Sequence, residues 1–359
     1  MSGRVARAEG HARPGRMSRL SASLLALLAL ALVLTSCGPS VAATNAPTGN
    51  AASIAVASWL SSKPFDPSVG APLPNNRIVM VYGITAGGPA QGPASTLDSL
   101  ENYLPQLQAL GKQYAALDPT HPVKLGVDLV VNVIQPCSWY PDFCASWQAN
   151  NKQLIGGVTV DGIQDYIDFC QQHGLLLFLD LQLGVQPVKD ALSYTDDKHT
   201  VSILAYLEKY PFVELALDTE FHFPNTKEGY AMAAGYPCCL GWMDASEINW
   251  TIDKLAEISL QNHLPRKVLV IHEWNSGVLS NKDKIKTNPD VSIVLHSDGF
   301  GSSTDKIYDY KVFVQDELIQ YGGYKLFLYY PGDSSSDTPL QTPEEIMQLF
   351  PQPLVISYQ

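Results

Sequence analysis

The chain has 359 residues, of which 46% are hydrophobic, and its formal charge is −12. This length and composition allow one large buried core, and the acidic balance argues against polyanionic partners such as nucleic acids and anionic lipid surfaces. Because the sequence has neither repeats nor a linker in mid-chain, it predicts a single large domain after the first segment.

The first 36 residues have the layout of a bacterial lipoprotein signal peptide. Five arginines precede an apolar run from Leu20 to Leu34, which is short for a membrane-spanning helix and typical of a secretory signal. Thr35 and Ser36 then place small side chains directly before Cys37, whose thiol would carry the lipid. The alternative is an ordinary signal peptide followed by a chance cysteine.

Cleavage before Cys37 would remove 36 residues, among them five arginines and one glutamate, and leave 323 residues with a formal charge of −16. Residues 37–76 are expected to form a small, flexible tether and a cap, and residues 77–359 the domain. Since no later run is long and apolar enough to cross a bilayer, the lipid would be the only membrane anchor. We expect an extracytoplasmic monomer, held at the cell membrane, without a nucleic-acid partner.

Apolar runs rich in leucine and β-branched residues alternate with amphipathic stretches as far as the last residue. The runs are almost continuously apolar, as in parallel strands that are covered on both faces. We expect eight strands, at residues 77–84, 124–133, 174–182, 213–221, 267–274, 291–299, 325–333 and 353–359. Helices are expected between them at residues 96–117, 160–173, 199–209, 246–263, 303–321 and 343–350, whereas residues 280–288 allow only a turn or two.

Eight strands in strict alternation with helices predict an α/β fold, a single-domain (β/α)8 TIM barrel. The first and last strands should pair to close the barrel, although no helix follows the last strand. A doubly wound open sheet is the alternative, and it would place these two strands at opposite edges.

Polar residues gather at the carboxyl ends of the expected strands, where a TIM barrel places its active site. Side chains two residues apart on a strand share a face, so neighbours such as Asp218 and Glu220 can both point into the mouth of the barrel. A strand end that meets water would also be polar, but this explains acids behind long apolar runs less well. The candidate catalytic residues are Glu220, Asp218, Asp298, Asp180 and Glu273.

The segment Asp218-Thr219-Glu220 ends the fourth expected strand. Two carboxylates on one face repel each other, so one should keep a raised pKa and act as a general acid while the other stays ionised. Cleavage of a glycosidic bond requires this division of roles.

A D-x-E motif at this place in a (β/α)8 barrel resembles the family 25 lysozymes and, more loosely, the family 18 chitinases. The resemblance implies a glycoside hydrolase in which Glu220 donates the proton and Asp218 assists the reaction at an N-acetyl sugar. It rests on the motif and on the order of the strands. The first strand offers Tyr82 where the lysozymes have an acid.

Aromatic residues fall in or beside the expected loops after the strands, where their rings could stack on the apolar faces of sugars. The same rings could instead pin these loops onto the barrel. Together with polar residues at the strand ends, they give the candidate substrate-binding residues Gln182, His272, His296, Trp274, Trp139, Trp242 and Tyr330.

The sequence therefore predicts a lipid-anchored glycoside hydrolase-like protein that cleaves or binds cell-wall or environmental carbohydrate, without a cofactor. Two alternatives stay open. One is a metal-dependent barrel hydrolase in which His272 and His296 bind a divalent ion together with Asp218 or Glu220, although the first strand lacks a His-x-His motif. The other is a lipoprotein that binds sugar without cleaving it.

The remaining cysteines are interpreted as structural, because their spacing fits no zinc-binding pattern. Cys137 and Cys144 flank a short loop, and an oxidising compartment would favour a disulfide between them.

Overall fold

The computed structural model describes residues 65–84, 92–132, 162–193, 201–223, 241–329 and 335–359. The main strands are β1 (Arg77–Ile84), β2 (Val123–Asn132), β3 (Leu176–Gly184), β4 (Val213–His222), β6 (Lys267–Glu273), β8 (Val291–Ser297), β9 (Tyr321–Leu326) and β10 (Val355–Tyr358). The helices are α2 (Leu97–Leu117), α4 (Ile163–His173), α5 (Val188–Ala191), α6 (Ile203–Lys209), α8 (Ala245–Gln261), α9 (Ser303–Tyr310) and α10 (Pro343–Ile346). Two short strands, β5 (Met243–Asp244) and β7 (Leu279–Ser280), pair with each other outside the barrel sheet.

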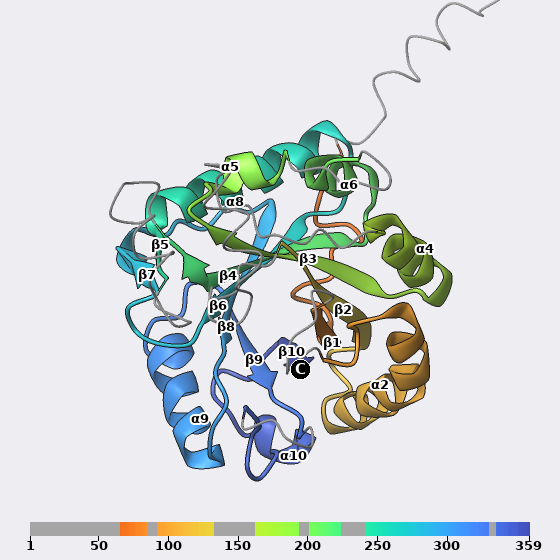
Figure 1. The fold of residues 1–359 in the computed structure, drawn as a ribbon, viewed down its shortest axis with the longest axis vertical. Coiled ribbons are helices and arrows are strands. Elements are labelled where there is room, and N and C mark those ends of the chain that lie inside the picture. Colours follow the sequence, from red (N-terminus) through yellow and green to blue (C-terminus); the bar gives the residue numbers. More distant parts are fainter. Residues whose placement is uncertain (1–64, 85–91, 133–161, 194–200, 224–240, 330–334) are drawn as a thin grey trace, which may run out of the picture. The chain divides into compact units, whose positions relative to one another are not determined.

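The eight main strands are parallel and close into a barrel in the order β1-β10-β9-β8-β6-β4-β3-β2. Figure 1 shows the strands in the centre and helices α2, α4, α6, α8 and α9 around them. The first and last strands pair from Ile78 with Val355 to Val81 with Tyr358. The predicted (β/α)8 TIM barrel is thus confirmed, and an open doubly wound sheet is excluded.

Local capping chemistry fixes several helix starts near the predicted positions. The Thr96 side chain accepts a hydrogen bond from the Ser99 backbone at the start of α2, and Thr342 and Glu345 form a reciprocal capping box at the start of α10. The lysine-rich stretch after β7 forms only a short 3₁₀ turn, η1 (Lys282–Lys284), as its sequence predicts. No helix of the described residues is long and apolar enough to cross a membrane.

Side chains alternate between the two faces of the barrel wall. One core cluster lies between strands and helices, and a second fills the barrel interior with residues such as Met80, Phe178 and Val270. Leu73, which precedes β1, packs into the interior cluster and is fully buried. The barrel is therefore a filled core, and polar side chains reach its interior only beyond these apolar layers.

The seventh barrel strand begins four residues earlier than its sequence predicts, at Tyr321 instead of residue 325. Gly322 and Gly323 lie inside β9 and make close approaches possible on both of its faces. A Cβ atom at Gly322 would lie 2.3 Å from the Tyr310 hydroxyl, and one at Gly323 would lie 2.4 Å from Cδ2 of His296. The two glycines interrupt the apolar pattern of this strand, so the sequence does not show where the strand begins. The observed register moves Lys325 from the first residue of the strand to its carboxyl end.

Candidate active site

The interior positions of the strands change from apolar to polar toward their carboxyl ends. Phe178, Ala216, Val270 and Val294 belong to the interior cluster, and each is followed two residues later by Asp180, Asp218, His272 or His296, respectively. Because positions two apart on a strand share a face, these polar side chains lie on the interior face above the apolar layer. All four are at least 98% buried, so they form a polar cluster under the mouth of the barrel.

A chain of charged hydrogen bonds links β6, the segment after β8, and β9. His272 Nδ1 donates to Asp298 Oδ2 over 2.7 Å, and Lys325 Nζ donates to the same oxygen over 2.9 Å. Burial alone would raise the pKa of Asp298, but Lys325 and His272 together hold it well below its usual range. The Lys325 ammonium also lies 4.1 Å from the centre of the Tyr82 ring. Asp298 is therefore a fixed negative charge between two cations.

The second ring nitrogen of His272 faces two further carboxylates. Its Nε2 atom is 3.8 Å from Asp128 Oδ2 and 3.9 Å from Asp180 Oδ2, which is too far for a hydrogen bond. Burial raises the pKa of Asp128 to about 6 and that of Asp180 well above its usual value, although the charge of His272 opposes both shifts. For His272, burial lowers the pKa, but Asp180 and Asp298 outweigh it and raise the pKa to about 9.

Asp218 and Glu220 share the interior face of β4, as their spacing predicts. Gln182 Nε2 donates to Asp218 Oδ2 over 2.8 Å, and the Glu220 backbone donates to Asp218 Oδ1 over 3.4 Å. Asp218 is buried, whereas Glu220 is partly exposed. Burial raises the pKa of both carboxyls, and the charges of Asp218 and Asp298 raise the pKa of Glu220 further, well above its usual value.

His296 lies beside His272 but has a different environment. The two rings meet edge to face with their centres 4.8 Å apart, and His296 Nε2 is 3.3 Å from the Ser357 hydroxyl. Burial and the positive charge of His272 lower the pKa of His296 well below its usual value. His296 is therefore a neutral ring that supports the cluster by packing and hydrogen bonding.

The structure thus places most of the sequence-predicted residues in one cluster, but it places Glu273 elsewhere. Glu273 lies on the outer face of β6, where Lys282 Nζ donates to it over 2.6 Å. Trp274 is partly buried against the core between strands and helices, and Trp242 is partly buried beside β5. Five predicted positions lie outside the described residues: Cys37, Cys137, Trp139, Cys144 and Tyr330.

Two charged members of the cluster are absent from the sequence-predicted site. Asp128 carried a usable signal, because it is an acid in the middle of an apolar strand and in phase with its polar end. Lys325 carried no such signal, because the expected strand begins at this residue. A lysine at the amino-terminal end of a barrel strand would lie at the end opposite the mouth.

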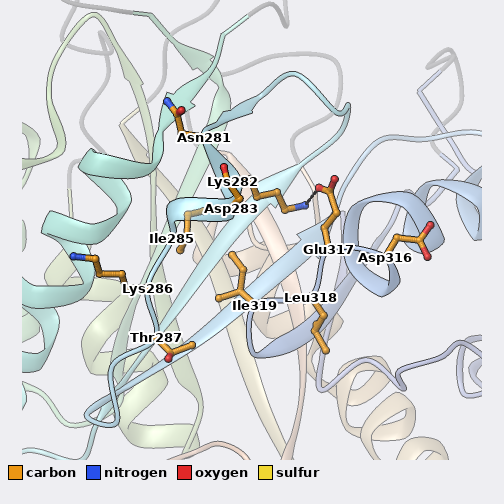
Figure 2. A pocket seen from close by; sticks show the side chains of 10 residues that line it. All are labelled: Asn281, Lys282, Asp283, Ile285, Lys286, Thr287, Asp316, Glu317, Leu318 and Ile319. Atoms are coloured by element: carbon orange, nitrogen blue, oxygen red, sulfur yellow. Dashed lines mark ion pairs between the residues drawn. The ribbon is translucent and has the colours of Figure 1, made fainter.

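A groove of about 950 Å³ lies on the outside of the barrel (Figure 2). Its lining includes Lys282 and Glu317, which form an ion pair at 2.9 Å, and the apolar side chains of Leu318 and Ile319. None of the clustered residues lines it. The buried charges and the convergence of six strands favour the mouth, and not this groove, as the candidate active site.

Comparisons with family models, with curated proteins and with solved structures gave no match to this chain.

Proposed function

We propose that this chain is a glycoside hydrolase that cleaves cell-wall or environmental carbohydrate, with Glu220 as its general acid. The observation that carries the proposal is the environment of Glu220. This carboxyl is partly exposed at the mouth, and burial and two acidic neighbours raise its pKa. It can therefore hold a proton near neutral pH and still reach a substrate.

A glycosidic oxygen is a poor leaving group, so its departure requires a proton from a nearby acid. An ordinary glutamic acid, with a pKa near 4.5, would have lost that proton at neutral pH. The position of Glu220 above Asp218 and Asp298 prevents this loss, because ionisation would add a third negative charge.

The same cleavage also requires negative charge that stabilises the positive charge developing on the sugar ring. Asp218 supplies it from the neighbouring position on β4, where the Gln182 amide fixes its orientation. Asp298 adds an ionised carboxylate that His272 and Lys325 hold in place. One protonated acid and two orientated carboxylates match the division of roles that glycosidases use.

The lipobox at Cys37 supports a location for this activity. A lipid on this cysteine would tether the barrel to the outer side of the cell membrane, where polymeric carbohydrate of the cell wall is within reach. Trp242 and the other aromatic residues near the strand ends are the groups we propose to stack on the sugars.

The test is the Glu220→Gln variant, assayed on peptidoglycan, chitin and aryl glycosides. We expect turnover of the polymers to fall by roughly 10²–10⁴-fold with little change in binding, because the amide keeps the shape and loses the proton. Aryl glycosides should lose much less, because their leaving groups need little protonation. In the parent protein, activity should decline as the pH rises through the raised pKa of Glu220, and the variant should lack this decline.

Glu317→Gln is the matched control, because Glu317 is 56% exposed and lies in the outer groove. Unchanged turnover of Glu220→Gln on both polymers and aryl glycosides would exclude Glu220 as the acid. If the parent protein binds these glycans and cleaves none, the non-catalytic sugar-binding alternative is the better account.

A further inference from the structure

Three side chains from three different strands converge at the bottom of the polar cluster. Asp128 from β2, Asp180 from β3 and His272 from β6 each offer one ligand atom, and these atoms lie within 4.8 Å of one another. The Asp128 and Asp180 side chains are fully buried, and His272 is 2% exposed. Apolar interior residues lie below them, so the three groups are shielded from water.

The hydrogen bonding of His272 determines which nitrogen is free. Asp298 already accepts from Lys325 as a carboxylate, so the short contact with His272 Nδ1 requires that nitrogen to be the donor. Once Nε2 has lost its proton, as metal binding requires, its lone pair faces Asp128 and Asp180. A carboxylate behind a histidine, with the other ring nitrogen free, is the usual support of a metal-binding imidazole.

The two carboxylates make no hydrogen bonds within the part of the chain that the structure describes. Among the described residues, neither oxygen of Asp128 or Asp180 has a hydrogen-bond partner, and neither does His272 Nε2. Buried carboxylates without hydrogen-bond partners are costly. A cation that accepts electron pairs from all three ligand atoms would offset this cost.

We propose that Asp128, Asp180 and His272 form a binding site for a divalent first-row transition metal, Zn²⁺ or Mn²⁺. Oxygen and nitrogen ligands lie about 2.0–2.2 Å from such an ion, so two ligands of one ion can be up to ~4.4 Å apart. The two separations from His272 Nε2, 3.8 and 3.9 Å, satisfy this limit, and all three ligand atoms lie within 4.8 Å of one another. The imidazole ligand favours Zn²⁺ over Mg²⁺ and Ca²⁺, which prefer oxygen alone, and the two carboxylates also suit Mn²⁺.

The ligand set differs from a site built on two histidines. His296 Nε2 is directed to Ser357, and its ring contacts His272 edge to face, so His296 supports the site without binding the ion. The balance of charges in the cluster also favours a bound cation. Lys325 and His272 are the cations of the described cluster, and they face five acids: Asp128, Asp180, Asp218, Glu220 and Asp298. A bound ion would use its remaining coordination positions to hold a water or substrate oxygen.

The test titrates the purified, chelator-treated protein with ZnCl₂ and separately with MnCl₂, using calorimetry and thermal unfolding. We expect one equivalent of at least one ion to bind and to raise the melting temperature, because the folded state alone presents the three ligands together. Asp128→Asn and Asp180→Asn should each weaken this binding by at least ~100-fold. Asp298→Asn should weaken it by about 10–100-fold, as loss of a supporting carboxylate does.

Glu214→Gln is the control, because Glu214 is an equally buried acid on β4 at the opposite end of the barrel. Its metal affinity should match that of the parent protein. The proposal is overturned if neither ion binds, or if Asp128→Asn and Asp180→Asn bind the ion as tightly as the parent does. Circular dichroism confirms that each variant is folded. Since binding is measured without substrate, failure of this site would leave the role of Glu220 untouched, and the reverse also holds.

Discussion

The two ends of this barrel bury charged side chains in opposite ways. At the amino-terminal end, Arg77, Glu214 and Lys267 are fully buried, and each makes hydrogen bonds to backbone groups. At the mouth, the acids outnumber the cations, and several carboxylate oxygens have no partner among the described residues. Arg77 Nη1 and Glu214 Oε1 at the amino-terminal end also lack a partner among the described residues, but the two cations there offset the charge of Glu214.

The partners at the amino-terminal end are mostly main-chain atoms. Lys267 Nζ donates to the carbonyl groups of Tyr210 and Val213 over 2.7 and 2.8 Å, and Glu214 Oε2 accepts from the Val268 backbone over 2.7 Å. These bonds hold the ends of β4 and β6 together. The charges there serve the fold, as expected for the end of a TIM barrel opposite its active site.

The excess of acids over cations at the mouth lowers the stability of the fold. Proteins accept such local conflicts where function requires them, since strain at an active site is commonly offset by stability elsewhere. We infer that the charges at the amino-terminal end serve the fold and that the excess of acids at the mouth serves the function. This contrast also predicts that substitutions at the two ends will have opposite effects on stability.

The largest expected effect is at the amino-terminal end. Lys267→Met removes two hydrogen bonds and leaves Glu214 as a buried charge without its neighbour. Burial raises the pKa of Glu214 and Lys267 opposes this shift, so the variant should have a still higher pKa at Glu214. At pH 8 we expect the free energy of unfolding to fall by about 3–5 kcal/mol, because the folded variant must either bury an unpaired carboxylate or keep a proton that the unfolded chain has released. Urea denaturation measures this change. Turnover per folded molecule should stay the same, and a parallel loss of turnover would show that the two ends are coupled.

At the mouth, a substitution that removes a carboxylate is expected to increase stability. Asp180→Asn removes one carboxylate from an over-populated cluster, so the metal-free variant should be more stable than the parent by about 1–2 kcal/mol. Its catalytic turnover should fall. Thermal unfolding in the presence of a chelator measures the difference. A less stable metal-free variant would mean that Asp180 has a structural partner, which would contradict the contrast between the two ends.

Much of this architecture could be predicted from the sequence, because it depends on local patterns. Continuous apolar runs and their helical spacers predict a (β/α)8 barrel, and the period of two along β4 correctly places Asp218 and Glu220 on one face. Residues beyond strand ends and within glycine-rich strands are harder to place. The register of β9 depends on the close contacts of Gly322 and Gly323 with other strands and helices, which no local pattern reveals.

Local sequence patterns also do not fully predict which acids lie together. Strand parity would have separated Glu273 from His272, because adjacent residues on a strand face opposite sides. Its position at a strand end suggested a catalytic role, but the structure shows an ion pair on the outer face with Lys282. By contrast, the contact of Asp298 with Lys325 joins the segment after β8 to β9, and the sequence alone could not align these two parts.

The smallest expected effect on turnover is at Glu273, which lies one residue from His272 but faces the helices. Glu273→Gln should leave turnover unchanged, because the side chain contacts Lys282 and no member of the cluster. Burial raises its pKa to about 7, although Lys282 opposes the shift. The folded protein therefore keeps this proton when the unfolded chain, with a pKa near 4.5, has lost it.

This difference gives a pH signature for the stability of the Glu273→Gln variant. In the parent protein, the ionisation of Glu273 reduces stability as the pH rises from about 4.5 to about 7, because the unfolded chain ionises first. Glutamine cannot ionise, so the stability of the variant relative to the parent should increase over this range. Urea denaturation at pH 5 and pH 8 measures both values. A large loss of turnover, with stability that follows the parent at both pH values, would instead place Glu273 in the catalytic cluster.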